Sequence, residues 1–397
     1  MKPNFFQMNL RRLMALAVPI ALTLAVSEVL AGAPLDALDQ PAYMSTKAPK
    51  ALMLSVLTSG SRLIAAGEHG VIVYSDDQGQ HWTQAQSPVS VMLVALTRAA
   101  PGHVWAVGHD GAVLASDDNG LHWERRFDGN QANSLMQQQA SQQLELARQG
   151  HAPDVVTDAE NALADVEAAL KFGPSRPLLS VWFKNENEGW VVGSYGQIFH
   201  TTDAGHKWES ISNRLQNKDG LHYNQIVGNG EGELLIAGEA GKIYQSKDWG
   251  KSWQTKDTGY QGQLYGVLTI PDASGETLLA YGFAGHAFRS GERNTTWHEL
   301  TSTTRKNLIG GYTLPGGGVR LIAQDGAVLD SDPAMNQLQL VRAGEGPAVA
   351  GVALLQDLGK DKDKNQIQNQ GQAGVLALAG IGGVRQIALD SVAGSHP

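Results

Sequence analysis

Short apolar runs recur along most of the chain and are separated by glycines and polar residues. The runs LIAA and VIVYS flank residues 67–70, and the runs HVWAV and AVLAS flank residues 108–111. A third apolar run precedes each pair, as LSVLT and LVALT do here. Short runs rich in β-branched residues and bounded by turn residues predict β-strands. The pattern therefore predicts an all-β chain of short, successive strands.

A glycine pair with two residues between its members lies inside each pair of strands. Such a tip favours a tight hairpin, because glycine adopts positive φ angles at little cost. Five copies are clear and the last two are weaker; they occupy residues 67–70, 108–111, 193–196, 238–241, 282–285, 323–326 and 380–383.

A second motif, Ser/Thr-x-Asp-x-Gly-x-x-Trp, follows these hairpins. It occupies residues 75–82, 116–123, 201–208 and 246–253, with a worn copy at 290–297. The Ser/Thr and Asp side chains can accept hydrogen bonds from the N–H groups of a turn, and the Trp ring can be buried between sheets. Because an active site is needed once and a turn in every repeat, we interpret these boxes as structural: Asp77, Trp82, Asp118, Trp123, Asp203, Trp208, Asp248 and Trp253.

The repeat length indicates the fold. Successive boxes start 41 residues apart between Ser75 and Ser116, and 45 apart between Thr201 and Ser246. Units of four strands at a period of about 40–50 residues are typical of β-propellers. Counting hairpins predicts seven four-stranded blades within residues 32–397, with residues 34–46 supplying the outer strand of the last blade.

Two insertions interrupt the repeat. Residues 128–177, between the second and third blades, predict a two-helix hairpin over 131–149 and 157–172, with Thr157 and Glu160 as a capping box. Residues 359–372 are polar and predict a flexible loop in the seventh blade. Strand alternation places the helical insertion on the same face as the glycine hairpins, and the boxes and polar loop on the opposite face.

The first 31 residues resemble a secretory signal. Lys2, Arg11 and Arg12 precede an apolar stretch over residues 13–26, and small residues follow before Gly32. The alternative is an uncleaved anchor, but the stretch contains Pro19 and is short for a span of about 20 residues. We therefore expect export to the periplasm with cleavage. The chain has no cysteine, so it forms no disulfide or thiolate site.

Charge and motifs narrow the function. The net charge is −9, and removal of the signal leaves about −11, which argues against nucleic acid and against anionic lipid as partners. No phosphate loop, nucleophile elbow, HExxH or calcium-loop pattern occurs, so we expect no cofactor and no metal. His69 and His109, with Glu68 and Asp110 beside them, could form a zinc site, but solvated turn residues are the favoured interpretation.

Candidate binding residues lie at the hairpin tips. Tips on a rigid scaffold often carry binding side chains, although plain polar turns are the alternative. The helical insertion adds nothing that a propeller requires, which favours a docking role. With Gln324, the tip side chains expected to ring the central opening and bind a partner are Glu68, His69, His109, Asp110, Tyr195, Glu239, Phe283 and Asp325.

The boxes and the GxxG hairpins resemble those of the photosystem II stability/assembly factor family, which carries Asp-box, or bacterial neuraminidase (BNR), repeats. The resemblance covers roughly residues 45–390 apart from the insertions. It implies an exported seven-bladed propeller without catalytic activity that assists assembly of a membrane complex. The two-helix insertion departs from the photosynthetic members. For a non-photosynthetic bacterial relative, the resemblance implies an integral membrane complex, such as a transporter of the resistance-nodulation-division (RND) superfamily, as the partner.

The alternative is a sialidase-like glycosidase or a glycan-binding propeller, because the same boxes occur on that fold. Such an enzyme needs three arginines around a carboxylate and facing carboxylates on the channel. The predicted inner strands carry almost no charged residues, and the arginines are scattered. The sequence therefore favours a non-enzymatic periplasmic scaffold.

Overall fold

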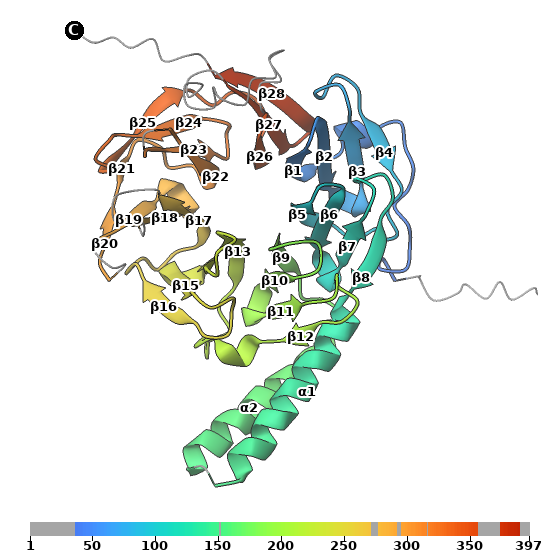
Figure 1. The fold of residues 1–397 in the computed structure, drawn as a ribbon, viewed down its shortest axis with the longest axis vertical. Coiled ribbons are helices and arrows are strands. Elements are labelled where there is room, and N and C mark those ends of the chain that lie inside the picture. The colour runs from blue at the N-terminus through green and yellow to red at the C-terminus, as the bar shows by residue number, and fades with distance from the viewer. Residues whose placement is uncertain are drawn as a thin grey trace, which may run out of the picture. The chain divides into compact units, whose positions relative to one another are not determined.

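The computed structural model describes residues 36–150, 152–270, 277–291, 295–315, 317–355 and 374–389. The predicted signal segment 1–31 and the polar loop 359–372 lie outside these residues. In the described residues the strands form seven sheets around a central opening (Figure 1). The predicted seven-bladed propeller is therefore confirmed.

Within each blade, successive strands pair antiparallel from the centre outward. In blades 1 to 3 they are β1 (Met53–Ser59), β2 (Arg62–Gly67), β3 (Ile72–Ser75), β4 (Thr83–Ala85); β5 (Leu93–Ala100), β6 (His103–Gly108), β7 (Val113–Ser116), β8 (Glu124–Phe127); and β9 (Leu178–Phe183), β10 (Gly189–Gly193), β11 (Ile198–Thr201), β12 (Glu209–Ser210). In blades 4 and 5 they are β13 (Tyr223–Gly228), β14 (Leu234–Gly238), β15 (Lys242–Ser246), β16 (Gln254–Asp257); and β17 (Leu264–Ile270), β18 (Thr277–Gly282), β19 (Ala287–Ser290), β20 (Trp297–Glu299).

The last two blades depart from the four-stranded pattern. Blade 6 contains β22 (Leu308–Thr313), β23 (Val319–Ala323), β24 (Val328–Ser331) and β25 (Gln337–Arg342). A short strand from the preceding connection, β21 (Thr301–Ser302), pairs parallel with its outer edge. In the described residues blade 7 has three strands: β26 (Val349–Leu355), β27 (Gly374–Gly380) and β28 (Gly383–Leu389).

The core lies between blades. The second strand of a blade is buried on both faces, as in β10 and β14, where every residue is buried. Seven buried clusters in the described residues each join two adjoining blades, and one of them joins blade 7 to blade 1. Burial of these aliphatic side chains is the main favourable contribution to folding.

The Ser/Thr-x-Asp-x-Gly-x-x-Trp boxes have the predicted structural role. The Ser116 hydroxyl donates to Asp118 Oδ1 over 2.9 Å and accepts from the Gly120 N–H over 2.8 Å. Asp118 Oδ1 also accepts from the His122 N–H, and Trp123 Nε1 donates to the Gly120 carbonyl. The corresponding bonds recur in blades 1, 3 and 4.

The Trp rings lie between sheets, as expected. Trp123 packs in the cluster shared by blades 1 and 2. Trp208 lies at 6.4 Å from Trp105 and Phe183, edge to face with both, in the cluster shared by blades 2 and 3. Each box therefore closes its turn and also joins its blade to the preceding one.

The predicted donation of an outer strand by residues 34–46 is wrong for the part that is described, residues 36–46. This segment instead follows the outer edge of blade 1. The Ala42 N–H donates to the Ser87 carbonyl, and the Ser90 N–H donates to the Ala37 carbonyl. Leu38 is buried in the core between blades 1 and 2, and burial of this apolar side chain favours the observed position.

The helical insertion is present, with different ends from those predicted. The helices are α1 (Gly129–Arg148) and α2 (Pro153–Leu170). The predicted capping box at Thr157 is wrong, because Pro153 begins α2 a full turn earlier and the Thr157 hydroxyl donates to the Pro153 carbonyl. The capping box belongs to α1, where Asp128 and Gln131 bond each other's backbone N–H groups.

We expect Asp118→Ala to lower the free energy of unfolding by about 1 kcal/mol at neutral pH, as for the loss of a helix cap. Partial burial opposes ionisation, but hydrogen bonds from His122 and Ser116 outweigh it and lower the pKa of Asp118. A lowered folded-state pKa stabilises the protein above the unfolded value near 4, and this contribution is lost as the pH falls through the folded value. Denaturant unfolding at several pH values should show the difference from wild type shrinking below about pH 4. A difference that stays constant or grows on acidification would contradict this role.

We expect Gly67→Ala to cost more than about 2 kcal/mol, because a β-carbon on Gly67 would overlap the Leu52 carbonyl oxygen. The control is Gly60→Ala, where φ is +65° but a β-carbon meets nothing within 4 Å. That change should cost only the local strain, about 1–2 kcal/mol at most. Urea unfolding compares the two variants, and equal costs would refute the steric argument.

Candidate partner-binding face

One face of the ring carries both the glycine turns and the base of the helical hairpin. We call it the tip face. Gly111, in the turn of blade 2, lies against Gly129, the first residue of α1, and a β-carbon on either glycine would overlap the neighbouring backbone. The predicted placement of the helical insertion beside the glycine hairpins is therefore confirmed.

The glycine turns share one geometry. The first residue after the first glycine donates its N–H to the carbonyl that precedes the inner strand, as Glu68 does to Leu52 and His109 does to Met92. This bond recurs in all seven blades. The next residue is left-handed in blades 1 to 5, with φ between 52° and 56° at His69, Asp110, Tyr195, Ala240 and Ala284.

Three of the predicted binding residues are engaged within their own blades. Glu68 Oε1 accepts from the Leu52 N–H over 2.8 Å, and Glu239 Oε2 accepts from the His222 N–H over 3.2 Å. Asp325 Oδ1 accepts from the Ala327 N–H. These carboxylates hold the turn and the start of the inner strand, so less of their hydrogen-bonding capacity remains for a partner.

The other five predicted residues differ in exposure. His69 and His109 are exposed, and the side chains of Tyr195 and Phe283 are 55% and 49% exposed. Asp110 is half-buried near Asp36, and its burial raises the pKa of the carboxyl. The tip face thus presents aromatic as well as polar side chains.

Tyr195 belongs to a cluster that the sequence did not reveal. The Arg176 guanidinium lies 4.8 Å from the centre of the Tyr195 ring, and the His222 ring packs against its edge at 5.0 Å. Burial lowers the pKa of Arg176. Arg176 lies where the insertion rejoins blade 3 and His222 precedes β13, so no shared motif signals their contact.

The hairpin leaves the ring beside β8 and β12 (Figure 1). Its helix α1 is anchored to blade 3, where the Gln139 amide donates to the Ser210 carbonyl over 2.7 Å. Ala132 is buried in the core between blades 2 and 3. By contrast α2 buries none of its side chains and carries five acidic residues, Asp154, Asp158, Glu160, Asp165 and Glu167, with no basic residue.

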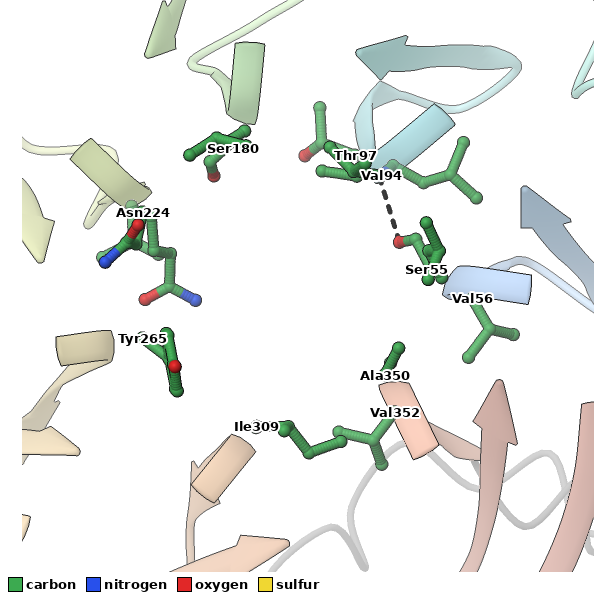
Figure 2. A pocket seen from close by; sticks show the side chains of 18 of the residues that line it. Ser55, Val56, Val94, Thr97, Ser180, Asn224, Tyr265, Ile309, Ala350 and Val352 are labelled. Atoms are coloured by element: carbon green, nitrogen blue, oxygen red, sulfur yellow. Dashed lines mark hydrogen bonds between the residues drawn. The ribbon is translucent and has the colours of Figure 1, made fainter. Parts of the chain in front are cut away.

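A cavity of about 610 Å³ occupies the centre of the ring (Figure 2). Its wall is formed by the inner strands of all seven blades, chiefly by their first residues, which adjoin the tip face. Of the tip residues predicted to ring the opening, Gln324 lines this cavity. The other predicted tip residues are not among those that line it.

The residues that line the cavity bear on the alternative of a sialidase-like glycosidase. The described residues that line the cavity include no Asp, Glu, Lys, Arg or His. The facing carboxylates that a glycosidase requires are therefore not on this wall. Within the described ranges, no three His, Asp or Glu side chains gather closely enough to hold a metal ion, and no helix combines the length and apolarity needed to cross a membrane.

Comparison with known proteins identifies relatives. A family model described as photosynthesis system II assembly factor YCF48 matches residues 167–389. No curated protein matches the sequence.

Two solved structures of YCF48 proteins resemble the chain. YCF48 from Cyanidioschyzon merolae is 12% identical, with a TM-score of 0.56 over 88% of this chain and 98% of that chain. A structure of YCF48 bound to D1 peptide is 21% identical, with a TM-score of 0.44 over 76% of this chain and 81% of that chain. The first of these supports the propeller fold.

We expect Glu68→Ala to lower the free energy of unfolding by about 1 kcal/mol, because the half-buried Leu52 N–H loses its acceptor. The control is His69→Asn. Because Asn also tolerates the left-handed φ of this position, the free energy of unfolding should stay within about 0.5 kcal/mol of the wild-type value. Chemical denaturation measures both. If Glu68→Ala were neutral, the side chain would be available to a partner after all.

Proposed function

Because the chain belongs to the photosynthesis system II assembly factor YCF48 family, we propose that it is a non-enzymatic accessory or assembly factor for an integral membrane protein complex. It works in the periplasm after removal of residues 1–31, as the signal-like sequence suggests. Its client is a complex other than a photosystem, such as an RND-superfamily transporter. The tip face and the helical hairpin bind this client.

One observation carries the proposal: α2 has no buried side chain, although its sequence is rich in Ala, Val and Leu. A helix that contributes so little to the core of its own protein is not required for the stability of the fold. Phe172, just after α2, is 78% exposed, and Val155 is 42% exposed. Exposed apolar side chains at both ends of a helix suit a docking element.

The neutral wall of the cavity supports a non-enzymatic role. General acid–base and nucleophilic catalysis require ionisable side chains in reach of the substrate. The central cavity offers hydroxyls, carboxamides and aliphatic groups instead. Such groups suit binding.

The hairpin can be removed cleanly. Its two ends meet, because Gly129 lies against Pro174 and the Asn133 amide donates to the Gly173 carbonyl. Deletion of residues 130–172 can therefore be closed with a short glycine-rich linker. This deletion also removes Ala132 from the core, so a second variant is needed that lacks only residues 142–159 and keeps Gln139 at blade 3.

We expect both deletions to abolish capture of the client by the tagged protein purified from the periplasm after mild crosslinking of the cell envelope. The shorter deletion should leave the thermal midpoint within about 2 °C, since the buried side chains that it removes, Leu144 and Ala147, belong to none of the clusters that join the blades. Leu340→Ser, at an exposed residue of the outer strand β25, is the control and should capture the client as wild type does. Full capture by the folded short deletion would refute the docking role. Mass spectrometry of the captured protein tests whether the client is an RND transporter.

A further inference from the structure

The central cavity has the chemistry of a binding site, and nothing above assigns it a ligand. We infer that it binds an uncharged, extended polypeptide segment with aliphatic and carboxamide side chains. The inference rests on the proposed function in one respect, namely that the segment belongs to the client protein. The cavity volume, about 610 Å³, is within the usual range of about 300–1,000 Å³ for ligand sites.

The wall excludes charged ligands. Its described residues provide no cation for a carboxylate or phosphate and no anion for an amine. A charged group that enters a site without a partner loses hydration and gains no compensating pair. A free chain terminus, an acidic sugar or a basic peptide is therefore disfavoured.

The wall mixes polar and aliphatic groups, and the hydroxyls of Ser55 and Thr97 lie beside the aliphatic side chains of blades 1 and 2 (Figure 2). Blades 1, 2, 6 and 7 contribute aliphatic side chains, among them Val56, Val94, Ile309 and Val352. Blades 3, 4 and 5 contribute hydroxyls and carboxamides from Ser180, Asn224, Gln225 and Tyr265. An extended strand places successive side chains on opposite sides, so one segment can contact polar and aliphatic groups of several blades at once.

Several hydroxyl groups of the wall are free to donate a hydrogen bond to a ligand. Ser180 Oγ accepts from the Ile226 N–H over 3.1 Å, and Ser55 Oγ accepts from the Leu96 N–H over 3.1 Å. Within the described part of the chain neither hydroxyl donates a hydrogen bond, and the Tyr265 hydroxyl has no partner. These groups can donate to carbonyl oxygens of a ligand.

The backbone of the inner strands supplies further donors. Each inner strand is the edge of its sheet, so part of its backbone faces the cavity unpaired. Ser55, Ser180 and Gln225 accept from N–H groups of the neighbouring inner strand. In the other four blades the equivalent residues have no polar side chain: Ala95, Gly266, Gly310 and Gly351.

In the described structure, four N–H groups of the inner strands consequently have no such side-chain acceptor on the neighbouring strand. They belong to Val56, Val181, Gly311 and Val352. Donors along strand edges favour a peptide backbone, whose carbonyls recur at regular intervals. The aliphatic wall favours apolar side chains over a hydrated sugar. Together they select an uncharged polypeptide.

The test uses the purified full-length protein and a library of capped nonapeptides, randomised over Val, Leu, Ile, Asn, Gln, Ser, Thr, Asp, Glu, Lys and Arg. We expect the selected peptides to be enriched in aliphatic and carboxamide residues and depleted of all four charged residues. Fluorescence anisotropy of labelled winners then measures affinity. Selection of charged peptides, or no selection, would overturn the inference.

Two variants locate the site. Ala350→Trp fills the cavity from an exposed residue of β26 and should weaken binding by more than about tenfold. Leu340→Trp, equally exposed on the outer edge of blade 6, is the matched control and should bind as wild type does. Thr97→Glu places a carboxylate on the wall and should shift the selected peptides toward Lys or Arg. Equal binding by Ala350→Trp would place the peptide elsewhere and refute the cavity.

The outcome is independent of the proposed function. Peptide selection uses no client, and client capture by the hairpin deletion uses no peptide. If the client is captured through the hairpin while the cavity selects nothing, the inference about the cavity fails alone. If neutral oligosaccharides such as maltoheptaose bind the wild type but not Ala350→Trp, while peptides do not bind, the inferred ligand class is wrong.

Discussion

The ring depends on the approach of each glycine turn to the backbone on either side of it. In blade 1 the missing side chain of Gly67 allows the turn to reach the Leu52 carbonyl at the start of the inner strand. The second glycine, Gly70, lies against Val89 in the connection to blade 2. One turn therefore positions a strand within its blade and the chain that begins the next blade. The contact of the first glycine recurs in every blade except blade 6, where Ala323 takes its place, and it helps to set the shape of the blades and their spacing.

The features that could be predicted from the sequence were those that the repeat enforces. Asp118 and Trp123 belong to a motif whose hydrogen bonds are local, so their spacing alone indicated their role. Contacts between residues far apart in the sequence left no such signal. The Leu52 N–H donates to the side chain of Glu68, which lies sixteen positions later at a hairpin tip. From the sequence alone, a glutamate at a tip could equally bind a partner. The predicted start of α2 at residue 157 is late, because Pro153 stands in the first turn, where its missing N–H costs nothing.

Departures from symmetry are the best guide to function in such a fold. Position by position the blades share their turns and buried strands, so a side chain present in only some blades is not required by the architecture. Ser180 and Gln225 hold polar groups at a position where three blades have glycine. Tyr195 rests between Arg176 and His222 at one tip only. These differences gather around the cavity and the base of the hairpin, on one side of the molecule.

The way in which the ring closes has a mechanical consequence. In the described residues no strand pairs with the outer edge of β28, and blade 7 meets blade 1 through a buried apolar cluster, through Gly383 against Pro49, and through the Gln386 amide bonded to the Gln78 carbonyl. Within the described ranges, no sheet combines strands from both ends of the chain. The seam between the first and last blades is therefore a packing surface of the same kind as the other six. Cutting the chain at another connection between blades and joining the ends of the described residues would preserve every described sheet, so closure of the ring does not require a particular blade to come first in the sequence.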